Sequence, residues 1–549
     1  MAFATVLDRY TQEEVDRFHR EGLWTDLTMF GELEKQAALR GDKVFITDSA
    51  TGYTFSQVRH EALRLAAGLH RRGIRAGDSV AVQIPSWAEF APIAMAISRL
   101  GAIIVPIQPI YRTHEVGHIL ETAGVRAVFT VEEYRGFDHV DMFLAFQHER
   151  EALDTVITVR AEGGHQGALT YQDMLVDADT AELEREIGPE GGPDDAFAIV
   201  FSSGTTSKAK GCLHTFNTLA CSARLQGEAY RYTAEDVQFG PSPVTHTTGL
   251  VTSIILPLIY GAGTHIMERW DPEEGLRHIE KFRCTATVNA STFLQTVLSV
   301  YDPARHDASS MRVWTLAGAP IPASLVEQAR TAMPAMKIIS LYGRTENVTT
   351  TMCDIEDPPS RAVTTDGRAL RGQQVRIIDA DGRELPRGEE GDIAYNGSMH
   401  LLEYIGLPEE DRAMFTDDGF SRSGDLGRMD ADGYVRVTGR LKDIVIRGGL
   451  NISVRQIEDL LIAHPAVAGV AVVAMPDPTM GERACCFLVP EHGCAPLTLE
   501  DISRYLLDQG LAIQKVPERL VVVPELPTTP TGKIQKNVLR EQIAQEVLA

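Results

Sequence analysis

The first 360 residues alternate between segments with helical spacing and short apolar runs. In the segment 53–73 the apolar residues stand three and four positions apart, which is the spacing of one face of a helix. The apolar run 78–85 follows, then a second helical segment at 87–102 and another apolar run at 103–107. Parallel strands need a crossover connection, so this alternation predicts parallel sheets with helices on both faces. We therefore expect an α/β protein.

Two later parts of the chain follow other patterns. Short apolar runs separated by Asp-Gly turns fill residues 360–438, which is typical of antiparallel β structure. After Arg440, helical segments at 454–465 and 499–511 are interspersed with apolar runs at 467–476, 483–490 and 519–526, as in a small α+β domain. We expect an N-terminal domain of α/β subdomains and a β-rich subdomain (1–439), a hinge (440–443) and a small C-terminal domain (444–549).

Composition limits the partners of the chain. Its 549 residues include 76 acidic and 52 basic side chains, a net charge of −24 that repels nucleic acid and anionic membranes. The seven cysteines form no CxxC pair, which argues against a disulfide framework and favours the reducing cytoplasm. The N-terminal residues have no apolar signal region, and the apolar stretch 251–267 is interrupted by Pro257 and two glycines, too short for a membrane span of ~20 residues. We expect a cytoplasmic protein without a membrane span.

A loop rich in hydroxyl groups follows the apolar run before residue 201. The sequence "FSSGTTSKAKG" (201–211) fails the phosphate-loop pattern G-x-x-x-x-G-K-[ST], because Ala209 replaces the second glycine and Gly211 follows Lys210. Taken alone it is read in two ways. Such residues make ordinary turns, and they also supply the backbone N–H groups, hydroxyls and ammonium groups that cradle phosphates.

Three further segments follow this loop in order: "LYGRTEN" (341–347), "SRSGDLGRMDADGYVRVTGRLKDIVIRGGLNIS" (421–453) and "LPTTPTGKIQKNVLR" (526–540). Together the four resemble the adenylate-forming superfamily of acyl-CoA synthetases, luciferases and peptide-synthetase adenylation domains. The resemblance runs from about residue 35 to 545, and four motifs in the right order make it specific.

The resemblance implies an ATP site. Thr345 is implied to touch the α-phosphate, Glu346 to bind Mg²⁺, and Asp425 to accept hydrogen bonds from the ribose hydroxyls with support from Arg440. Lys533 is implied to be the phosphate-directed cation of the first step, which makes it catalytic together with Thr345, Glu346 and Arg440. The remaining nucleotide contacts fall on Ser202, Ser203, Gly204, Thr205, Thr206, Lys210, Gly318, Ala319, Pro320, Tyr342 and Gly343.

The same resemblance implies an acid pocket and a pivot. The segment around His246 gates and walls the pocket, which is assigned to His246, Thr247, Thr248, Gly249 and Gly318. No Asp occurs between residues 237 and 270 to hold an α-ammonium group, which disfavours amino acids. Lys442 is implied to be the hinge about which a mobile C-terminal domain turns, bringing Lys533 to the phosphates first and residues 447–451 to a thiol second.

Three departures from the family pattern stand in the chain. Ser207-Lys208-Ala209-Lys210 replaces the usual Gly-x-Pro-Lys, Val454 and Gln456 stand where many relatives have Pro and Glu, and Asn289–Thr292 replaces a common Val-Pro. The first two leave the lysine and the reacting groups in place, whereas the third alters the segment beside the acid pocket.

The implied activity is ATP-dependent activation of an uncharged, apolar carboxylic acid, whether medium-chain, alicyclic or aromatic. The acyl adenylate would release pyrophosphate on forming and then pass its acyl group to coenzyme A, giving acyl-CoA and AMP. Two alternatives stay open: transfer to a carrier protein or a separate thiolating partner, and a catalytically silent ATP-binding module. The sequence leaves the oligomeric state open, and a homodimer is compatible with it.

Overall fold

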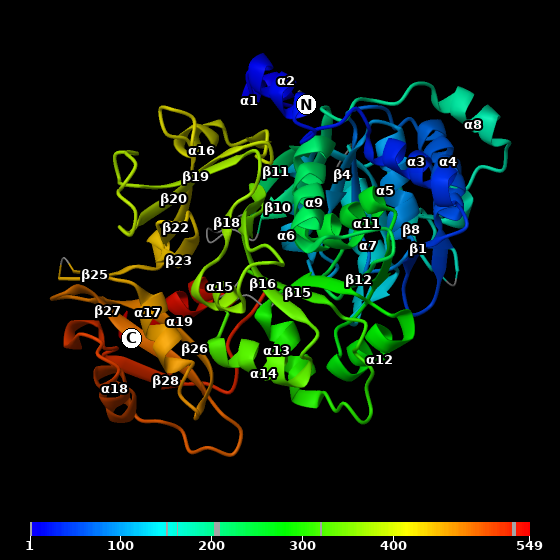
Figure 1. Ribbon diagram of the computed structural model, residues 1–549. Helices are drawn as coiled ribbons and strands as arrows, with labels where there is room; N and C mark the ends of the chain where they lie inside the picture. The colour runs from blue at the N-terminus through cyan, green and yellow to red at the C-terminus, as the bar shows by residue number, and fades with distance from the viewer. Residues whose placement is uncertain are drawn as a thin grey trace.

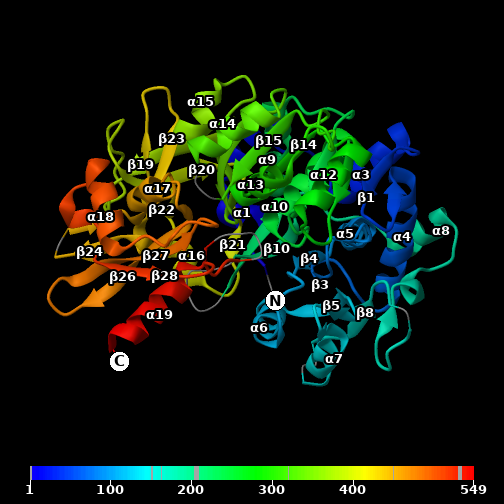
Figure 2. The same ribbon diagram turned by 90° about the horizontal axis from the view of Figure 1, so that it is seen from below.

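The computed structural model describes residues 3–149, 152–161, 163–202, 209–318, 321–448, 450–529 and 534–548. Within these ranges the chain forms two large sheets, a four-stranded sheet, a C-terminal sheet and a two-stranded ribbon, β6 (Glu133–Tyr134) with β7 (Phe137–Asp138). The four-stranded and C-terminal sheets lie at one end of the molecule, and the two large sheets at the other (Figure 1). Figure 2 shows the same separation from below.

The first large sheet has eight strands. Their order is β21 (Glu403–Tyr404), β11 (Lys210–Thr215), β10 (Ala196–Ser202), β4 (Ile103–Pro106), β3 (Ser79–Gln83), β5 (Val125–Thr130), β8 (Thr155–Thr158) and β9 (Leu169–Thr170). The strands from β10 to β9 run parallel, and β11 and β21 add an antiparallel edge. The apolar runs of the sequence form β3, β4, β5 and β10, as predicted.

The second large sheet has nine strands. Their order is β18 (Arg368–Ala369), β17 (Asn347–Met352), β16 (Lys337–Arg344), β15 (Val313–Ala317), β14 (Ala286–Asn289), β12 (Val237–Gly240), β13 (Gly263–Ile266), β1 (Val44–Thr47) and β2 (Gly52–Thr54). The central strands are parallel, and a tight antiparallel turn joins β16 to β17. This turn carries Thr345 and Glu346.

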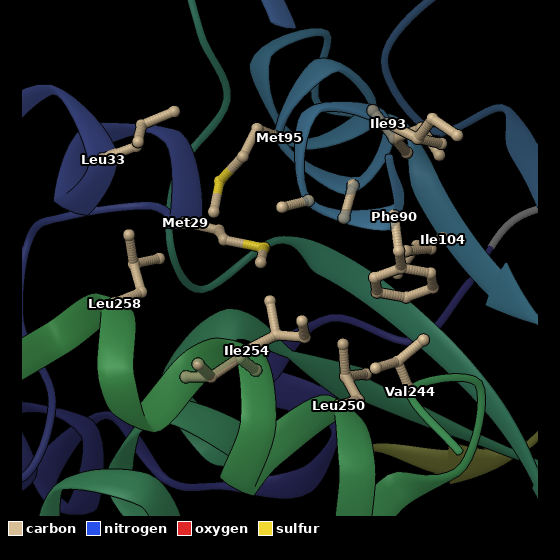
Figure 3. Close-up of a cluster of buried hydrophobic side chains, with 14 of the residues drawn as sticks. Met29, Leu33, Phe90, Ile93, Met95, Ile104, Val244, Leu250, Ile254 and Leu258 are labelled. Carbon is tan, nitrogen blue, oxygen red and sulfur yellow. The ribbon is translucent and has the colours of Figure 1, made fainter. Parts of the chain in front are cut away.

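Helices cover the large sheets and share one core between them. They are α1 (Val6–Arg9), α2 (Gln12–Arg20), α3 (Met29–Arg40), α4 (Phe55–Arg71), α5 (Phe90–Arg99), α6 (Thr113–Ala123), α7 (His139–Glu149), η1 (Gln172–Met174), α8 (Thr180–Ile187), α9 (Phe216–Tyr230), α10 (Thr247–Gly249), the π-helix η2 (Leu250–Ile255), α11 (Leu256–Tyr260), α12 (Pro272–Phe282), α13 (Ser291–Val300), α14 (Ala323–Ala332) and α15 (Pro359–Thr364). Figure 3 shows Met29 of α3 and Met95 of α5 facing Ile254 of η2 across this core. Burial of these side chains fastens the two large sheets together.

The four-stranded sheet is antiparallel, as the Asp-Gly turns predicted. It consists of β19 (Gln373–Ile378), β20 (Gly391–Gly397), β22 (Ser421–Met429) and β23 (Val435–Arg440), and α16 (Pro408–Ala413) lies between β20 and β22 in the chain.

The C-terminal sheet follows a 3₁₀ turn, η3 (Leu441–Asp443). It contains β25 (Leu450–Ile452), β24 (Val445–Arg447), β27 (Gly481–Pro490), β26 (Val467–Asp477) and β28 (Arg519–Val522), with α17 (Val454–Leu461), α18 (Leu499–Asp508), η4 (Ile513–Lys515) and α19 (Lys536–Leu548). Two apolar cores pack within this part of the chain. The predicted class, α/β with a large N-terminal and a small C-terminal domain, is confirmed. In the described ranges, no helix is long and apolar enough to cross a bilayer.

Candidate active site

A cleft of about 270 Å³ opens where the large sheets, the four-stranded sheet and η3 meet. Much of its lining comes from the carboxyl ends of β10, β14, β15 and β16, which is where ligands bind in open parallel sheets. The lining residues are Ser202, Lys210, Ser242, His246, Thr247, Thr248, Asn289, Ala290, Ala317, Gly318, Leu341, Gly343, Arg344, Thr345, Glu346, Val348, Tyr404, Ser423, Gly424, Asp425, Arg440 and Lys442.

Asp425 lines the cleft and is held from two sides. The Tyr342 hydroxyl donates to its Oδ2 at 2.7 Å, and Arg440 Nε lies 2.9 Å from its Oδ1. The carboxylate is buried, and its own amide N–H is bonded to Ser423 Oγ. Both oxygens are therefore oriented in advance, and each keeps a lone pair for a further donor such as a ribose hydroxyl.

Glu346 is a buried carboxylate with two side-chain donors. The Tyr404 hydroxyl lies 2.6 Å from its Oε1, and Arg344 Nη2 lies 3.3 Å from the same oxygen. Burial alone would raise the pKa of the Glu346 carboxyl, but the Arg344 guanidinium and the Tyr404 hydroxyl hold it below its ordinary value. Glu346 is therefore an anion at neutral pH.

The main chain of the β16–β17 turn is fixed by His214 of β11. Its Nε2 lies 2.8 Å from the Thr345 carbonyl oxygen, and its Nδ1 lies 3.1 Å from the Thr218 hydroxyl. Burial lowers the pKa of His214 to about 4, so the ring is neutral at pH 7. A carbonyl only accepts, hence Nε2 carries the proton and Nδ1 is the unprotonated nitrogen of the ring.

Lys210 lies where the hydroxyl-rich loop rejoins the sheet. Its ammonium group pairs with Glu410 of α16 and stands 4.9 Å from the centre of the Tyr404 ring. The side chain is largely covered yet still lines the cleft. A cation so placed can turn toward a polyphosphate when one enters.

Part of the cleft lining is small and uncharged. It includes Thr247 and Thr248 of α10 together with Ala290, Leu341 and Val348. The Thr247 hydroxyl is buried and has no hydrogen-bond partner in the described part of the chain.

The loop before α10 packs tightly. His246 caps the helix, since its Nδ1 accepts from the Thr248 N–H at 3.2 Å. A Cβ on Gly249 would lie 2.1 Å from the Pro243 carbonyl oxygen, so this position needs glycine for the turn to approach. Gly249 thus allows the close packing that places the neighbouring Thr247 and Thr248 in the lining of the cleft.

Arg440 and Lys442 reach the cleft from the segment that leads to the C-terminal sheet. Asp443, the next residue, points into that part of the molecule, where it pairs with Arg540 and lies 4.0 Å from Lys536 of α19. On one side of the predicted hinge Lys442, Arg440 pairs with Asp425 of the four-stranded sheet. On the other side, Asp443 pairs with a residue of the C-terminal helix α19.

The structure brings most of the predicted residues to one place. The cleft is lined by Ser202, Lys210, His246, Thr247, Thr248, Gly318, Gly343, Thr345, Glu346, Asp425, Arg440 and Lys442, while Tyr342 and Gly249 lie directly behind it. Ser203, Gly204, Thr205, Thr206, Ala319, Pro320 and Lys533 lie outside the described residues.

Sequence reasoning missed three residues of the cleft and its support. Arg344 stands inside the quoted "LYGRTEN" motif, where a cation beside an acid was a usable signal. Tyr404 and His214 carry no such signal, because their partners lie 58 and 131 positions away in the chain.

The residues fit the two charged ligands that the site implies. An ionised carboxylate in a cleft suits Mg²⁺, a hard cation that prefers oxygen ligands and is bound through one or two carboxylates plus phosphates. Asp425, with both oxygens oriented, suits a ribose, and Arg440 and Lys210 supply positive charge for phosphates in an otherwise acidic protein.

The cleft combines ionised carboxylates and cations with small uncharged side chains, beside the segment that leads to the C-terminal sheet. The chain belongs to the adenylate-forming enzymes: the AMP-binding enzyme family model matches residues 33–405, and the model of the AMP-binding enzyme C-terminal domain matches residues 456–533. It is thus a member of an ATP-binding ligase family.

Characterised relatives span nearly the whole chain. The medium-chain fatty-acid–CoA ligase of Escherichia coli K12 is 32% identical over 539 residues, 98% of this chain and 94% of that protein. The 3-[(3aS,4S,7aS)-7a-methyl-1,5-dioxo-octahydro-1H-inden-4-yl]propanoyl:CoA ligase of Rhodococcus jostii RHA1 is 31% identical, covering 93% and 98%. The 2,3-dihydroxybenzoate-AMP ligase of Bacillus subtilis 168 is 29% identical, covering 98% of each.

Solved structures agree over the same length. ATP-bound MatB from Rhodopseudomonas palustris superposes with a TM-score of 0.83 at 28% identity, and apo MatB with 0.73 at 29%; each covers 94% of this chain and 99% of that one. The ATP-bound structure of MatB thus superposes on this chain better than the apo structure does.

Proposed function

We propose that this adenylate-forming enzyme acts on an uncharged, apolar carboxylic acid and passes the acyl group to coenzyme A. The observation that carries the proposal is that the cleft which holds Glu346, Asp425 and Arg440 is also lined by uncharged threonine, alanine, leucine and valine side chains. A second charge on the acid would be buried there without a partner, which is costly. Medium-chain, alicyclic and aromatic acids fit this chemistry.

In the first step a carboxylate oxygen of the acid attacks the α-phosphorus of ATP. A new O–P bond forms, the bond from the α-phosphorus to the bridging oxygen breaks, and pyrophosphate leaves with the electron pair. Negative charge builds on the α-phosphate, so cations and hydrogen-bond donors fixed in advance lower the barrier. We assign this role to Thr345 and Arg440 in the cleft, and to Lys533.

Mg²⁺ bound at Glu346 would neutralise phosphate charge during this step. Asp425, held by Tyr342 and Arg440, would bind the ribose and fix the nucleotide in line with the acid. The contribution of the chain to this step is thus two carboxylates, Glu346 and Asp425, that are oriented before the ligands bind.

In the second step the sulfur of a thiol attacks the carbonyl carbon of the acyl adenylate. The C–S bond forms, the C–O bond to phosphate breaks, and AMP leaves while the thiol proton passes to solvent. Coenzyme A is the thiol named for two relatives, one of them the E. coli enzyme. The cytoplasm, where coenzyme A is used and thiols stay reduced, suits the seven free cysteines.

A second candidate is transfer to a carrier protein or a separate partner. The relative from B. subtilis favours it, since that protein is named for the adenylation step alone. The two candidates differ only in the acyl acceptor.

One experiment separates them and tests the acid class. Acid-dependent exchange of labelled pyrophosphate into ATP is measured for octanoate, cyclohexanecarboxylate and benzoate, with alanine and malonate as charged controls. AMP and acyl-CoA are then measured after coenzyme A is added. Exchange with an apolar acid and stoichiometric acyl-CoA support the proposal, exchange without acyl-CoA supports the second candidate, and preference for alanine or malonate refutes the acid class.

A further inference from the structure

Tyr404 is a buried residue of the cleft that the chemistry so far leaves unused. It lies in the two-residue strand β21, which pairs with β11 through Cys212 and so extends the edge of the eight-stranded sheet. Its side chain reaches the space between the phosphate-directed Lys210 and the carboxylate Glu346. These two groups come from segments more than 130 residues apart.

The hydroxyl of Tyr404 acts on Glu346. At 2.6 Å it makes the shorter of the two side-chain contacts to Glu346 Oε1, and Arg344 shares that same oxygen at 3.3 Å. An ionised carboxylate only accepts hydrogen bonds, so the Tyr404 phenol is the donor in this contact. With both side-chain donors on one oxygen, Oε2 is left clear of them for a cation.

The ring of Tyr404 acts on Lys210. The ammonium group lies 4.9 Å from the ring centre, within the range of a cation–π contact. Glu410 holds the same ammonium group from α16. The ring and Glu410 thus hold the Lys210 ammonium group, so that it does not form an ion pair with Glu346.

We propose that Tyr404 is a positioning residue that separates the two charges of the phosphate site: its hydroxyl aims Glu346 at Mg²⁺, and its ring holds Lys210 for the polyphosphate. The inference rests on the proposed function for the identity of the ligands. Outer partners of metal-binding carboxylates typically govern metal affinity by about 10–100-fold.

The chain offers a matched set of variants. Tyr404→Phe removes only the hydroxyl and leaves the ring for Lys210, whereas Tyr404→Leu removes both. Tyr395→Phe is the control, because Tyr395 is also a buried tyrosine, and its hydroxyl makes no hydrogen bond with Glu346. Melting temperatures of all variants report whether each one folds.

The test measures ATP binding by calorimetry across a series of Mg²⁺ concentrations, without any acid. For Tyr404→Phe we expect the half-saturating Mg²⁺ concentration to rise about 10–100-fold, with Mg²⁺-free ATP affinity unchanged. Tyr404→Leu should weaken Mg²⁺-free ATP binding as well, and Tyr395→Phe should match the wild type. Equal Mg²⁺ dependence in Tyr404→Phe and Tyr395→Phe would overturn the proposal.

The outcome is independent of the acid and the thiol. If wild-type protein binds Mg²⁺–ATP but exchanges pyrophosphate with no apolar acid, the proposed function fails while the role of Tyr404 stands. If exchange is normal and the Mg²⁺ dependence of Tyr404→Phe equals that of the wild type, the proposed function stands while the role of Tyr404 fails.

Discussion

At the scale of single residues, the cleft is organised by pairing charges before any ligand arrives. Asp425 is matched with Arg440, and Glu346 with Arg344. A buried carboxylate without such a partner would take up a proton and lose its charge. The two carboxylates proposed to bind ligands therefore depend on their arginine partners to stay ionised.

His214 gives the first prediction. His214→Ala removes the donor to the Thr345 carbonyl and should lower the rate of pyrophosphate exchange about tenfold, the scale of one buried hydrogen bond left unmade. His214→Gln places an amide N–H near the position of Nε2 and should recover most of that loss. Exchange rates at saturating ATP and acid, compared with melting temperatures, check this, and equal rates in the two variants would remove His214 from the site.

Lys533 gives the second. A fixed ammonium stabilises the charge that develops around the α-phosphate more than it stabilises the bound substrates. Lys533→Ala should therefore slow adenylation by about 10²–10³-fold and leave thiolation of supplied acyl adenylate nearly intact. Lys536→Ala is the control, since Lys536 pairs with Glu458 instead. Similar losses in both half-reactions would count against the assignment.

At the scale of elements, helix α16 restrains the phosphate site. Its Glu410 pairs with Lys210, so the pair must open before Lys210 reaches a phosphate. Glu410→Gln should therefore tighten ATP binding by roughly two- to fivefold, the scale of a partly exposed ion pair. Glu409→Gln, the same change at the neighbouring exposed position of α16, controls for the loss of charge. Dissociation constants that are equal for both variants would contradict the restraint.

The elements also show which parts of the molecule the sequence can predict. Strands β3 and β4 follow from runs of apolar residues, and β19, β20, β22 and β23 follow from Asp-Gly turns, because both signals are local. The motifs pointed to residues that line the cleft, such as Glu346 and Asp425. The pairing of β21 with β11 could not be predicted from the sequence, because a strand of two residues has no periodicity and its position depends on tertiary packing.

At the scale of the whole molecule, buried histidines make the fold sensitive to acid. Burial lowers the pKa of His139 and His214 to about 4, and of His265 and His400 to about 3, against an ordinary 6.5. All four are neutral in the fold and take up protons on unfolding, so their contribution is complete above pH 6.5 and is lost as pH falls toward 4.

Stability should accordingly fall between pH 6.5 and 5. Glu190, whose pKa burial raises to about 7, acts in the opposite sense, as do Glu61 and Glu458, whose pKa values burial also raises. Thermal melts from pH 7.5 to 5, with proton uptake measured on unfolding, test this. His139→Asn should flatten the slope, by at most about 1.4 kcal/mol per pH unit for one group. A melting temperature that stays constant over this range would refute it.

The short segment 441–442 connects the four-stranded sheet to the C-terminal sheet, and the two parts also touch where Ser453 Oγ donates to the Thr438 carbonyl oxygen at 2.8 Å. Arg440 is tied to Asp425 in the four-stranded sheet, and Asp443 is tied to Arg540 and comes close to Lys536 in α19. Any rotation of the C-terminal sheet that leaves these contacts intact must be absorbed at positions 441 and 442. The better superposition on ATP-bound than on apo MatB is consistent with arrangements that change with the ligand.

Lys442→Pro tests whether the rotation occurs there. Proline fixes φ near −65° and restricts the residue before it, so it should favour one arrangement of the two parts. Because the proposed half-reactions need different arrangements, their rates should diverge by about tenfold, a barrier difference of ~1.4 kcal/mol. Lys442→Ala removes the same ammonium group from the cleft but leaves the backbone free, so it should slow the two steps alike. Adenylation is followed by pyrophosphate exchange, and thiolation by acyl-CoA release from supplied acyl adenylate. If proline and alanine at this position give the same ratio of rates, the junction is not the pivot, and the rotation must be sought beyond Asp443.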